Sequence, residues 1–443
     1  MAHWVEIDRS SGPTADSTLL LWPAGKLKYG TRYIVAMRSL RDTSGLPVQV
    51  SSAFTAFRDK IPTSDPDVEL RRATFEDIFV RLAKAGWSRS QLQIAWDFTT
   101  ASRQATTQGL VHMRDDGLAR LDKEGYSYTI LEVDNNYSPQ VAKRIVGLYK
   151  IPLYLESELP GAYLVIDPTT GLPVFQGWGE AVFELTIPTS VTNGTFSSPA
   201  PNVVYGHGLF GSHEELQYGT YQRIQAKYGW NFIGTDMWGL SEIDVPFVAD
   251  MFLQDMSPFR TIPDRCSQGV LNTLVLTRLL RKLATDPLTQ FNGKPAIDPN
   301  TVYYNGNSQG GIGGNIVMAL TQDIERGVLG VPGASYDILL PRSKDFVILF
   351  DILKARYWSP MDRINMLTVV QQLWERGGPA GYMDAIIDNT LPNTPKHSVI
   401  AQYGLGDCQV TWLGALAMSR SIGCNMYQGN LQVGNETLYG FPM

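Results

Sequence analysis

The stretch YYNGNSQGG at residues 303–311 decides how the rest of the chain is interpreted. It contains Gly306, Ser308 and Gly310 in the pattern Gly-x-Ser-x-Gly, in which a sharp strand-to-helix turn lifts a serine hydroxyl clear of a sheet. The chain has 41 glycines, so an ordinary glycine-rich turn is the alternative. An apolar strand-like run precedes the motif, and residues 312–320 continue it with helical apolar spacing. We therefore predict that Ser308 is a nucleophile, with a helix N-terminus behind it.

A second glycine-rich segment, NVVYGHGLFGS at residues 202–212, follows another strand-like run. Acyl transfer needs backbone N–H donors aimed at the developing oxyanion. We expect Leu209 to supply one donor and Gln309, the residue after the serine, to supply the other. His207 and Gly208 are assigned to shaping this loop, and His207 is not expected to be a base. An ordinary loop with a packed histidine is the alternative.

The third segment, SVIAQYGLGDCQV at residues 398–410, is a strand that ends in Gly-x-Gly-Asp. An acid on a later strand than the nucleophile suits the chain order Ser…Asp…His, in which Asp407 would hold and polarise the histidine. The alternative is that Asp407 caps the next turn, a common role for aspartate. Asp384 and Asp388 are the reserve candidates.

None of the five histidines follows Asp407; they are His3, His112, His207, His213 and His397. His397 enters the strand that Asp407 leaves, which puts it roughly 30 Å from the site at strand spacing. His213 opens a helix beyond the glycine-rich loop. A base must reach the serine directly or through one water. We therefore expect that the chain is truncated and that its catalytic histidine lies beyond Met443, or that the protein is an inactive relative.

From about residue 125, strand-like and helix-like runs alternate, which predicts a mostly parallel sheet covered by helices. The expected strands are 162–166, 181–187, 202–205, 231–235, 301–304 and 398–403, with helices over 214–227 and 266–284. A hairpin is expected around residues 169–171, at the start of the sheet. Residues 340–390 are rich in large apolar side chains and are expected to form a helical cap over the serine, or ordinary core.

The first part of the chain has a different pattern. Short strand-like runs at residues 4–7, 19–22 and 33–37 are separated by turn residues, which suggests part of an antiparallel sandwich. Residues 27–45 resemble the last strands of bacterial immunoglobulin-like domains. We expect a partial immunoglobulin-like β domain over 1–60, a connector of helices and a strand over 61–124, and the main domain over 125–443.

Together, the motifs around Ser308, Leu209 and Asp407 resemble those of the α/β-hydrolase superfamily, and most closely bacterial exported esterases and lipases. The resemblance covers residues 125–443 and includes the strand and loop at 228–239. It implies an α/β-hydrolase fold, Ser308 as nucleophile, Asp407 as acid and Leu209 as an oxyanion donor. It also implies a small-molecule or lipid-like ester as substrate. The immunoglobulin-like segment suggests an exported or extracellular protein, although the first residues contain no signal peptide.

Composition excludes several classes of protein. With 443 residues, 44% hydrophobic and 18% charged, the chain is globular rather than disordered. Its net charge of −6 and lack of a basic stripe argue against nucleic-acid binding, and no apolar run reaches membrane-spanning length. Cys266, Cys408 and Cys424 form neither a disulfide framework nor a zinc motif, and no His-Glu-x-x-His motif occurs. No metal or organic cofactor is expected.

The sequence thus predicts a serine hydrolase that cleaves carboxylic esters through an acyl-enzyme. The alternative is a catalytically inactive hydrolase-fold module that serves binding or surface attachment. The oligomeric state, the acyl-chain length and the preference for esters or amides are left open by these patterns.

Overall fold

The computed structural model describes residues 1–8 and 18–427 of the chain. They fall into two compact units, one formed by residues 1–26 with 106–443 and the other by residues 27–105. These limits differ from the boundaries expected at about residues 60 and 124. The last residues of the expected main domain, 428–443, lie outside the described residues.

The smaller unit consists of one antiparallel strand pair and two helices. Strand β3 (Arg32–Arg38) pairs with β4 (Leu92–Thr99), and α1 (Ser52–Asp59) packs with α2 (Pro66–Lys84). Its core is largely aromatic, with contacts between Phe54, Phe57, Phe75 and Phe79. Helix α2 begins after the N-cap Asp65, whose carboxylate accepts the amides of Asp67 and Val68.

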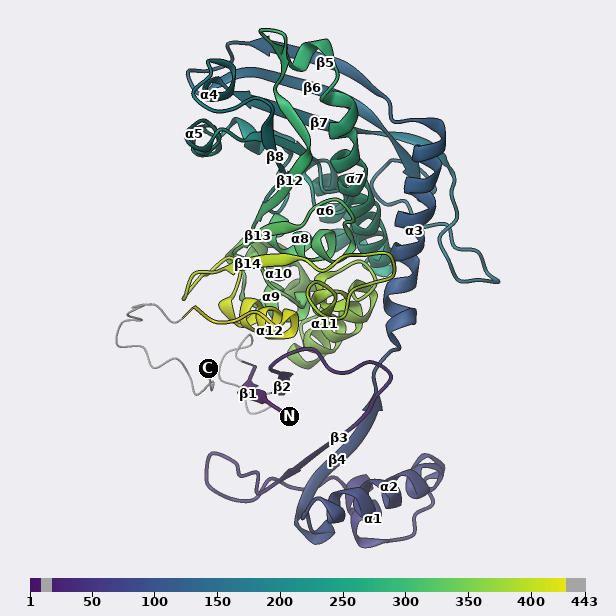
Figure 1. Cartoon of the computed structure of the whole chain (residues 1–443). Coiled ribbons are helices and arrows are strands. Elements are labelled where there is room, and N and C mark those ends of the chain that lie inside the picture. Colours follow the sequence, from purple (N-terminus) through teal and green to yellow (C-terminus); the bar gives the residue numbers. More distant parts are fainter. Residues whose placement is uncertain (9–17, 428–443) are drawn as a thin grey trace. The chain divides into compact units, whose positions relative to one another are not determined.

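The larger unit is built on an eight-stranded sheet in the order β14-β13-β12-β8-β9-β7-β6-β5 (Figure 1). Five neighbouring strands are parallel: β9 (Asn231–Thr235), β8 (Ala200–Gly206), β12 (Ile297–Asn307), β13 (Arg326–Gly330) and β14 (Ser398–Gln402). The remaining three are antiparallel to their neighbours: β7 (Gly177–Pro188), β6 (Val141–Leu153) and β5 (Tyr128–Asn135). The predicted α/β architecture with a mostly parallel sheet is confirmed.

Helices cover both faces of this sheet. Val203 in β8 packs in a cluster with Leu216 and Ile224, beside α5 (Gly219–Tyr228). The next residue, Val204, packs in the main core with side chains of α7, because successive strand residues point to opposite faces. The long helices in contact with the main core and the strands are α3 (Arg103–Glu124), α7 (Thr261–Leu283), α8 (Gln309–Leu320) and α12 (Trp412–Ile422).

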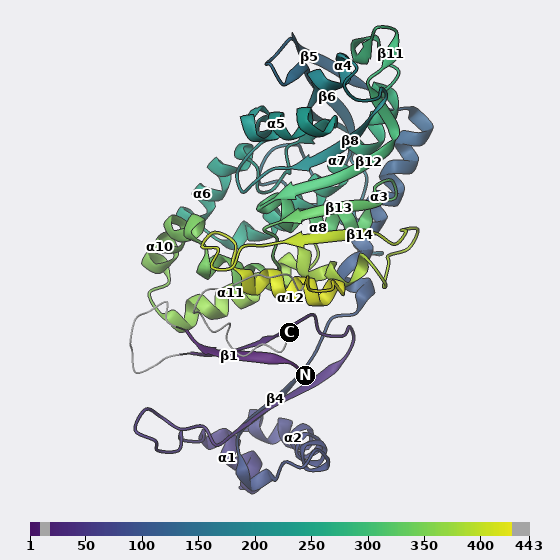
Figure 2. The same ribbon diagram turned by 60° about the vertical axis from the view of Figure 1, so that its left-hand side comes forward.

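A helical insertion connects β13 to β14. It contains α9 (Tyr336–Leu339), α10 (Val347–Arg356) and α11 (Pro360–Trp374), and α10 packs against α6 (Val245–Gln254). In Figure 2 the arrowheads of β12, β13 and β14 point toward the side of the unit where α6 and α10 lie. The helices expected between residues 340 and 390 are therefore present, at the carboxyl ends of the parallel strands.

Some expected elements differ in the structure. Residues 162–166 are not a sheet strand but part of an excursion between β6 and β7, held by the isolated bridges Leu155↔Leu164 and Ile166↔Pro173. The predicted turn near residue 170 does form, capped by the Asp167 carboxylate, yet it lies outside the sheet. Strands β5, β6 and β13 were not predicted. Two lysines and one arginine interrupt the apolar pattern of β6, and β13 is five residues long and contains two glycines.

The three strands expected in the first 60 residues form but do not share one sheet. Strand β1 (His3–Ile7) pairs with β2 (Leu19–Pro23), whereas β3 pairs with β4 in the other unit. The immunoglobulin-like resemblance is therefore not confirmed. The β1–β2 pair belongs to the larger unit, where Glu6 forms an ion pair with Arg342. The remaining short elements are α4 (Thr189–Thr192), β10 (Gln290–Phe291) and β11 (Lys294–Pro295).

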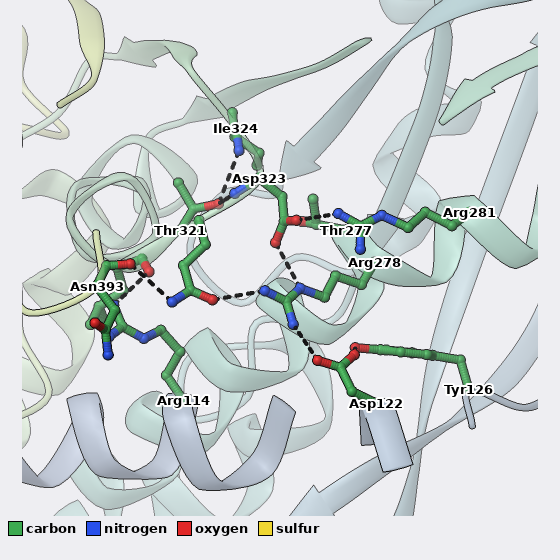
Figure 3. A network of polar contacts seen from close by, with 12 residues as sticks. Arg114, Asp122, Tyr126, Thr277, Arg278, Arg281, Thr321, Asp323, Ile324 and Asn393 are labelled. Carbon is green, nitrogen blue, oxygen red and sulfur yellow. Dashed lines mark hydrogen bonds and ion pairs between the residues drawn. The ribbon is translucent and has the colours of Figure 1, made fainter. Parts of the chain in front are cut away.

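A polar network joins α7 to the segment that enters β13 (Figure 3). Arg278 donates to Asp323 at 2.8 Å and to Asp122 at 3.1 Å, and Arg281 binds the other oxygen of Asp323 at 2.6 Å. Because Asp323 precedes β13, this network lies at the amino end of that strand, away from Ser308 at the carboxyl end of β12. Among the described helices, none is long and apolar enough to cross a membrane.

Candidate active site

Ser308 occupies a single-residue turn between a strand and a helix. Strand β12 ends at Asn307, and α8 begins at Gln309. Ser308 has φ 57° and ψ −118°, a positive φ that is sterically disfavoured for a residue with a Cβ atom. Its amide donates to the Gly330 carbonyl at 3.0 Å, which ties the turn to the end of β13. Ser308 is partly exposed, and a serine must be accessible if it is to attack a substrate from such a turn.

The glycines of the motif allow two backbones to approach closely. A Cβ atom on Gly310 would lie 2.0 Å from the carbonyl oxygen of Gly206, the last residue of β8. A Cβ atom on Gly306 would lie 2.1 Å from the carbonyl oxygen of Gly310, which also accepts the Tyr304 hydroxyl at 2.7 Å. No side chain fits at these positions without displacement of backbone. The serine turn and the start of the loop at residues 206–212 are therefore in direct contact.

The loop at residues 206–212, which carries the predicted oxyanion donor Leu209 and is for that reason called the oxyanion loop below, faces the serine. A Cβ atom built on Gly208 would lie 3.9 Å from the Cβ of Ser308. The Leu209 amide donates to no acceptor among the described residues. Gln309 is the first residue of α8, and first-turn amides of an α-helix have no intrahelical acceptor. The structure thus brings the two predicted donor residues and Ser308 to one cavity wall.

Both ring nitrogens of His207 are engaged within the fold. Nε2 accepts the Met237 amide at 2.7 Å, so Nδ1 carries the proton and donates to the Gly208 carbonyl at 2.7 Å. The side chain is 1% exposed, and burial lowers the pKa of His207. A neutral histidine with no free nitrogen does not serve as a base for Ser308.

Asp407 lies in the turn that follows β14. Its Oδ1 accepts the amides of Gln409 at 2.8 Å and Val410 at 3.0 Å, which is the turn-capping arrangement considered as the alternative. Its Oδ2 accepts no hydrogen bond from the described part of the chain. Gln409 and Val410, which follow Asp407 closely in the sequence, line the same cavity as Ser308. The capping role and an acid role are compatible, because each uses a different oxygen.

The reserve acids have other partners. Asp384 accepts Lys26 at 2.7 Å, and the exposed Asp388 pairs with Lys396 at 3.2 Å. Neither lines the cavity beside Ser308.

No histidine lies among the described residues that line this cavity. His213 Nδ1 is 2.8 Å from Asp236 Oδ1. Burial alone lowers the pKa of His213, but the hydrogen bond and charge of Asp236 outweigh it and raise the pKa. His397 is buried just before β14, at the end of the strand opposite Asp407.

The cavity beside Ser308 is almost entirely apolar. Its walls come from the oxyanion loop, from residues 240–262 after β9, and from the cap helices. Tyr336 and Trp374 have ring centroids 4.1 Å apart, and the Gln309 side chain hydrogen-bonds the Tyr336 hydroxyl at 3.0 Å. The aromatic side chains of the wall are Phe210, Phe252, Phe259, Tyr336, Phe346 and Trp374. The only charged residue among the described lining residues is Asp345, which accepts the Gln409 side chain at 3.0 Å.

One contact was missed from the sequence. The sequence patterns assigned no role to the two glutamates after His213, yet the Glu215 carboxylate accepts the Gly208 amide at 3.0 Å. Only Glu214 is exposed. No sequence pattern distinguishes two adjacent glutamates in this respect, because the difference depends on the curvature of the loop. The three cysteines are free thiols.

Comparison with known proteins gives similarity at the level of folds. No protein-family model matches the chain, and no curated protein sequence matches it. An acetyl xylan esterase from a Thermoanaerobacterium species is similar over 71% of this chain and 84% of its own, with 14% identity and a TM-score of 0.42. An acetyl xylan esterase from Paenibacillus sp. R4 is similar over 73% and 89%, with 12% identity and a TM-score of 0.42. The acylaminoacyl peptidase of Pyrococcus horikoshii is similar over 63% and 41%, with 14% identity and a TM-score of 0.36.

The architecture itself is clear from the described residues. A mainly parallel sheet carries Ser308 on a strained strand-to-helix turn, a glycine-rich loop from the neighbouring strand faces it, and a helical insertion covers the carboxyl ends of the strands. The described residues therefore form the mostly parallel α/β sheet, serine turn and helical insertion that the α/β-hydrolase resemblance implied.

Proposed function

We propose that this protein hydrolyses carboxylic esters through an acyl-enzyme on Ser308. The observation that carries the proposal is the positive φ of Ser308 at the carboxyl end of β12, beside an apolar cavity. Such backbone strain persists only where the surrounding structure imposes it, and it is concentrated at functional sites. In the first step the Ser308 oxygen attacks the ester carbonyl, and the amides of Leu209 and Gln309 hold the oxyanion. Collapse of the intermediate releases the alcohol, and water then releases the acid.

A base is needed to take the serine proton and return it to the leaving alcohol. Asp407 would orient this base through its Oδ2, while Oδ1 remains bound to the turn amides. The described residues supply no histidine to the cavity wall. The expectation that the histidine follows Met443 in the whole protein stays a prediction.

The apolar lining supports an ester with an apolar acyl or alcohol group as substrate. Burial of one methylene group contributes about 0.8 kcal/mol, so a wall of aromatic and aliphatic side chains favours such groups over polar ones. Asp345 at the wall disfavours an anionic substituent nearby. The proposed substrates are therefore neutral esters with a hydrophobic moiety.

Labelling with a fluorophosphonate probe tests the nucleophile. The whole protein should be labelled at Ser308, and Ser308→Ala should lose all labelling. Ser343→Ala is the matched control, since Ser343 lines the same cavity but lies at the start of the cap, and it should be labelled like the wild type. Labelling that survives in Ser308→Ala would exclude this serine as the nucleophile.

The second candidate, an inactive binding module, is favoured by one observation: no described histidine lines the cavity. Turnover of neutral p-nitrophenyl esters by the whole protein separates the two. Activity that Ser308→Ala abolishes supports the hydrolase. Saturable binding of such esters without turnover supports the module.

A further inference from the structure

The oxyanion loop curves around one carboxylate. Glu215 Oε1 accepts the Gly208 amide at 3.0 Å, and the Gly211 amide donates to the Gly208 carbonyl at 3.1 Å. A Cβ atom on Gly211 would lie 2.3 Å from Glu215 Oε1, and one on Gly208 would lie 3.2 Å from it. The carboxylate therefore occupies the inside of the curve, where glycine leaves room for it.

The second oxygen of Glu215 is tied to the sheet. Oε2 accepts the hydroxyl of Tyr205 at 2.7 Å, and the hydroxyls of Tyr205 and Tyr221 are 2.6 Å apart. Tyr205 is buried near the end of β8. Burial, the hydrogen bond with Tyr221 and the charge of Glu215 all raise the pKa of Tyr205, so its phenol keeps its proton and donates. Glu215 is thus held by a rigid element and holds the loop in turn.

These contacts affect the Leu209 amide directly. The amide before it, on Gly208, is bound by Glu215, and the amide after it, on Phe210, donates to the Leu240 carbonyl at 2.9 Å. Of these three consecutive amides, only that of Leu209 has no acceptor in the described part of the chain. The Leu209 N–H shares its planar peptide unit with the Gly208 carbonyl, which accepts His207 Nδ1 at 2.7 Å and the Gly211 amide at 3.1 Å. Glu215 holds the peptide unit on the other side of the Gly208 Cα, so the direction of the Leu209 N–H depends on both sets of contacts.

We propose that Glu215 is the positioning residue of the oxyanion hole: its carboxylate fixes the Gly208 peptide so that the Leu209 N–H is presented to the oxyanion on Ser308. This inference rests on the proposed function of Ser308. Glu215 acts through the loop and touches neither the ester nor the reacting atoms. Its effect should therefore be seen in the transition state and much less in the binding of the ester itself.

The test compares Glu215→Ala and Glu215→Gln with Glu214→Ala in the whole protein. The control Glu214 is the adjacent, exposed residue of the same type. The readouts are kcat and KM for a neutral p-nitrophenyl ester, and the inhibition constant of an alkylboronic acid, which binds a serine as a tetrahedral anion. In Glu215→Ala we expect kcat to fall by about 10- to 100-fold with KM within about threefold, and boronate affinity to fall by a similar factor. Glu215→Gln keeps an acceptor for the Gly208 amide and should restore most of kcat, whereas Glu214→Ala should match the wild type.

An unchanged kcat and boronate affinity in Glu215→Ala would overturn the inference, and so would a loss confined to KM. If Glu215→Ala does not fold, Tyr205→Phe removes the hydroxyl that binds the second carboxylate oxygen and Tyr221, leaves the Glu215 bond to the Gly208 amide in place, and should lower kcat by a smaller factor at constant KM. An equal kcat in that variant would also count against the inference.

Failure of the proposed function gives a different result: a wild type that neither turns over esters nor reacts with the fluorophosphonate. Amide hydrogen exchange over residues 206–212 then tests the Glu215 contact alone. We expect exchange at least about tenfold faster in Glu215→Ala than in Glu214→Ala, since an amide loses its hydrogen-bond protection. Equal exchange in the two variants would overturn the positioning role.

Discussion

Replacement of Gly310 by alanine is the sharpest test of the site geometry. The added Cβ would lie 2.0 Å from the Gly206 carbonyl oxygen and 2.3 Å from its carbonyl carbon. Contacts to a Cβ atom below 3.0 Å do not occur in folded proteins, so the two backbones must separate by about 1 Å. Such a separation moves the Ser308 turn away from the oxyanion loop.

The size of the effect follows from this displacement. A misplacement of about 1 Å between a nucleophile and its stabilising groups lowers the rate by about 100-fold, which corresponds to about 2.7 kcal/mol of transition-state stabilisation. Strain from the extra methyl group lowers the free energy of unfolding by about 1–3 kcal/mol. We therefore expect Gly310→Ala to fold with reduced stability and to lose about 99% of kcat/KM.

The assay combines ester hydrolysis, the rate of fluorophosphonate labelling and urea unfolding. Gly109→Ala is the matched control, because its Cβ would make only an ordinary contact, 3.6 Å from Pro173, within α3. This control should retain wild-type activity and should be as stable as the wild type or more stable. A Gly310→Ala protein with more than half of the wild-type labelling rate and unchanged stability would refute the close approach of the serine turn to the oxyanion loop.

Three further predictions concern the cavity and two buried charges. Along a series of p-nitrophenyl esters from acetate upward, kcat/KM should rise about three- to fourfold per methylene until the cavity is filled, and Trp374→Ala should shift the optimum to longer chains; a flat series would contradict the apolar acyl site. Arg265→Ala should lower the free energy of unfolding in urea by about 3–5 kcal/mol, because it leaves the Asp244 carboxylate charged and buried without its partner. Replacement of the exposed Arg281 by alanine should lower it by less than about 1 kcal/mol. Equal losses in the two variants would refute the argument from burial. The wild type should have a larger free energy of unfolding than His213→Gln below the ordinary histidine pKa of 6.5, and this difference should vanish as the pH rises through the raised pKa of His213. Urea unfolding at several pH values measures it. A difference that grows with pH would contradict the ion pair with Asp236.

Local features of the site were predictable from the sequence. The turn at Ser308 requires glycines on both sides, an apolar strand before it and an apolar helix after it, and all of these are visible in one short window. The same holds for the loop at Leu209 and for the strand that leads to Asp407. The structure confirms the strand or helix next to each motif. These elements could be predicted because the spacing of apolar residues that marks a strand or a helix is visible within a few residues of the sequence.

Other features required the folded chain. Residues 162–166 have the composition of a strand but find no partner in the sheet, since strand formation depends on which neighbour is available. The same dependence explains why β13, a short strand with two glycines, pairs with β12 and β14 in the sheet without any sequence signal. The roles of Glu214 and Glu215 also differ only because the loop curves around one of them.

The order of the candidate groups along the chain could be predicted from the sequence alone: the loop expected to bind the oxyanion, the turn that carries the predicted nucleophile, and a candidate acid after them. Each of these depends on backbone conformations that a few neighbouring residues impose. Three features required the folded chain: the contact of Gly206 with Gly310, the bond of Glu215 to the Gly208 amide, and the apolar cavity that distant helices form beside Ser308. These contacts join segments that are near in space but far apart or unrelated in sequence pattern, and they form only when burial of the sheet and cap brings the segments together.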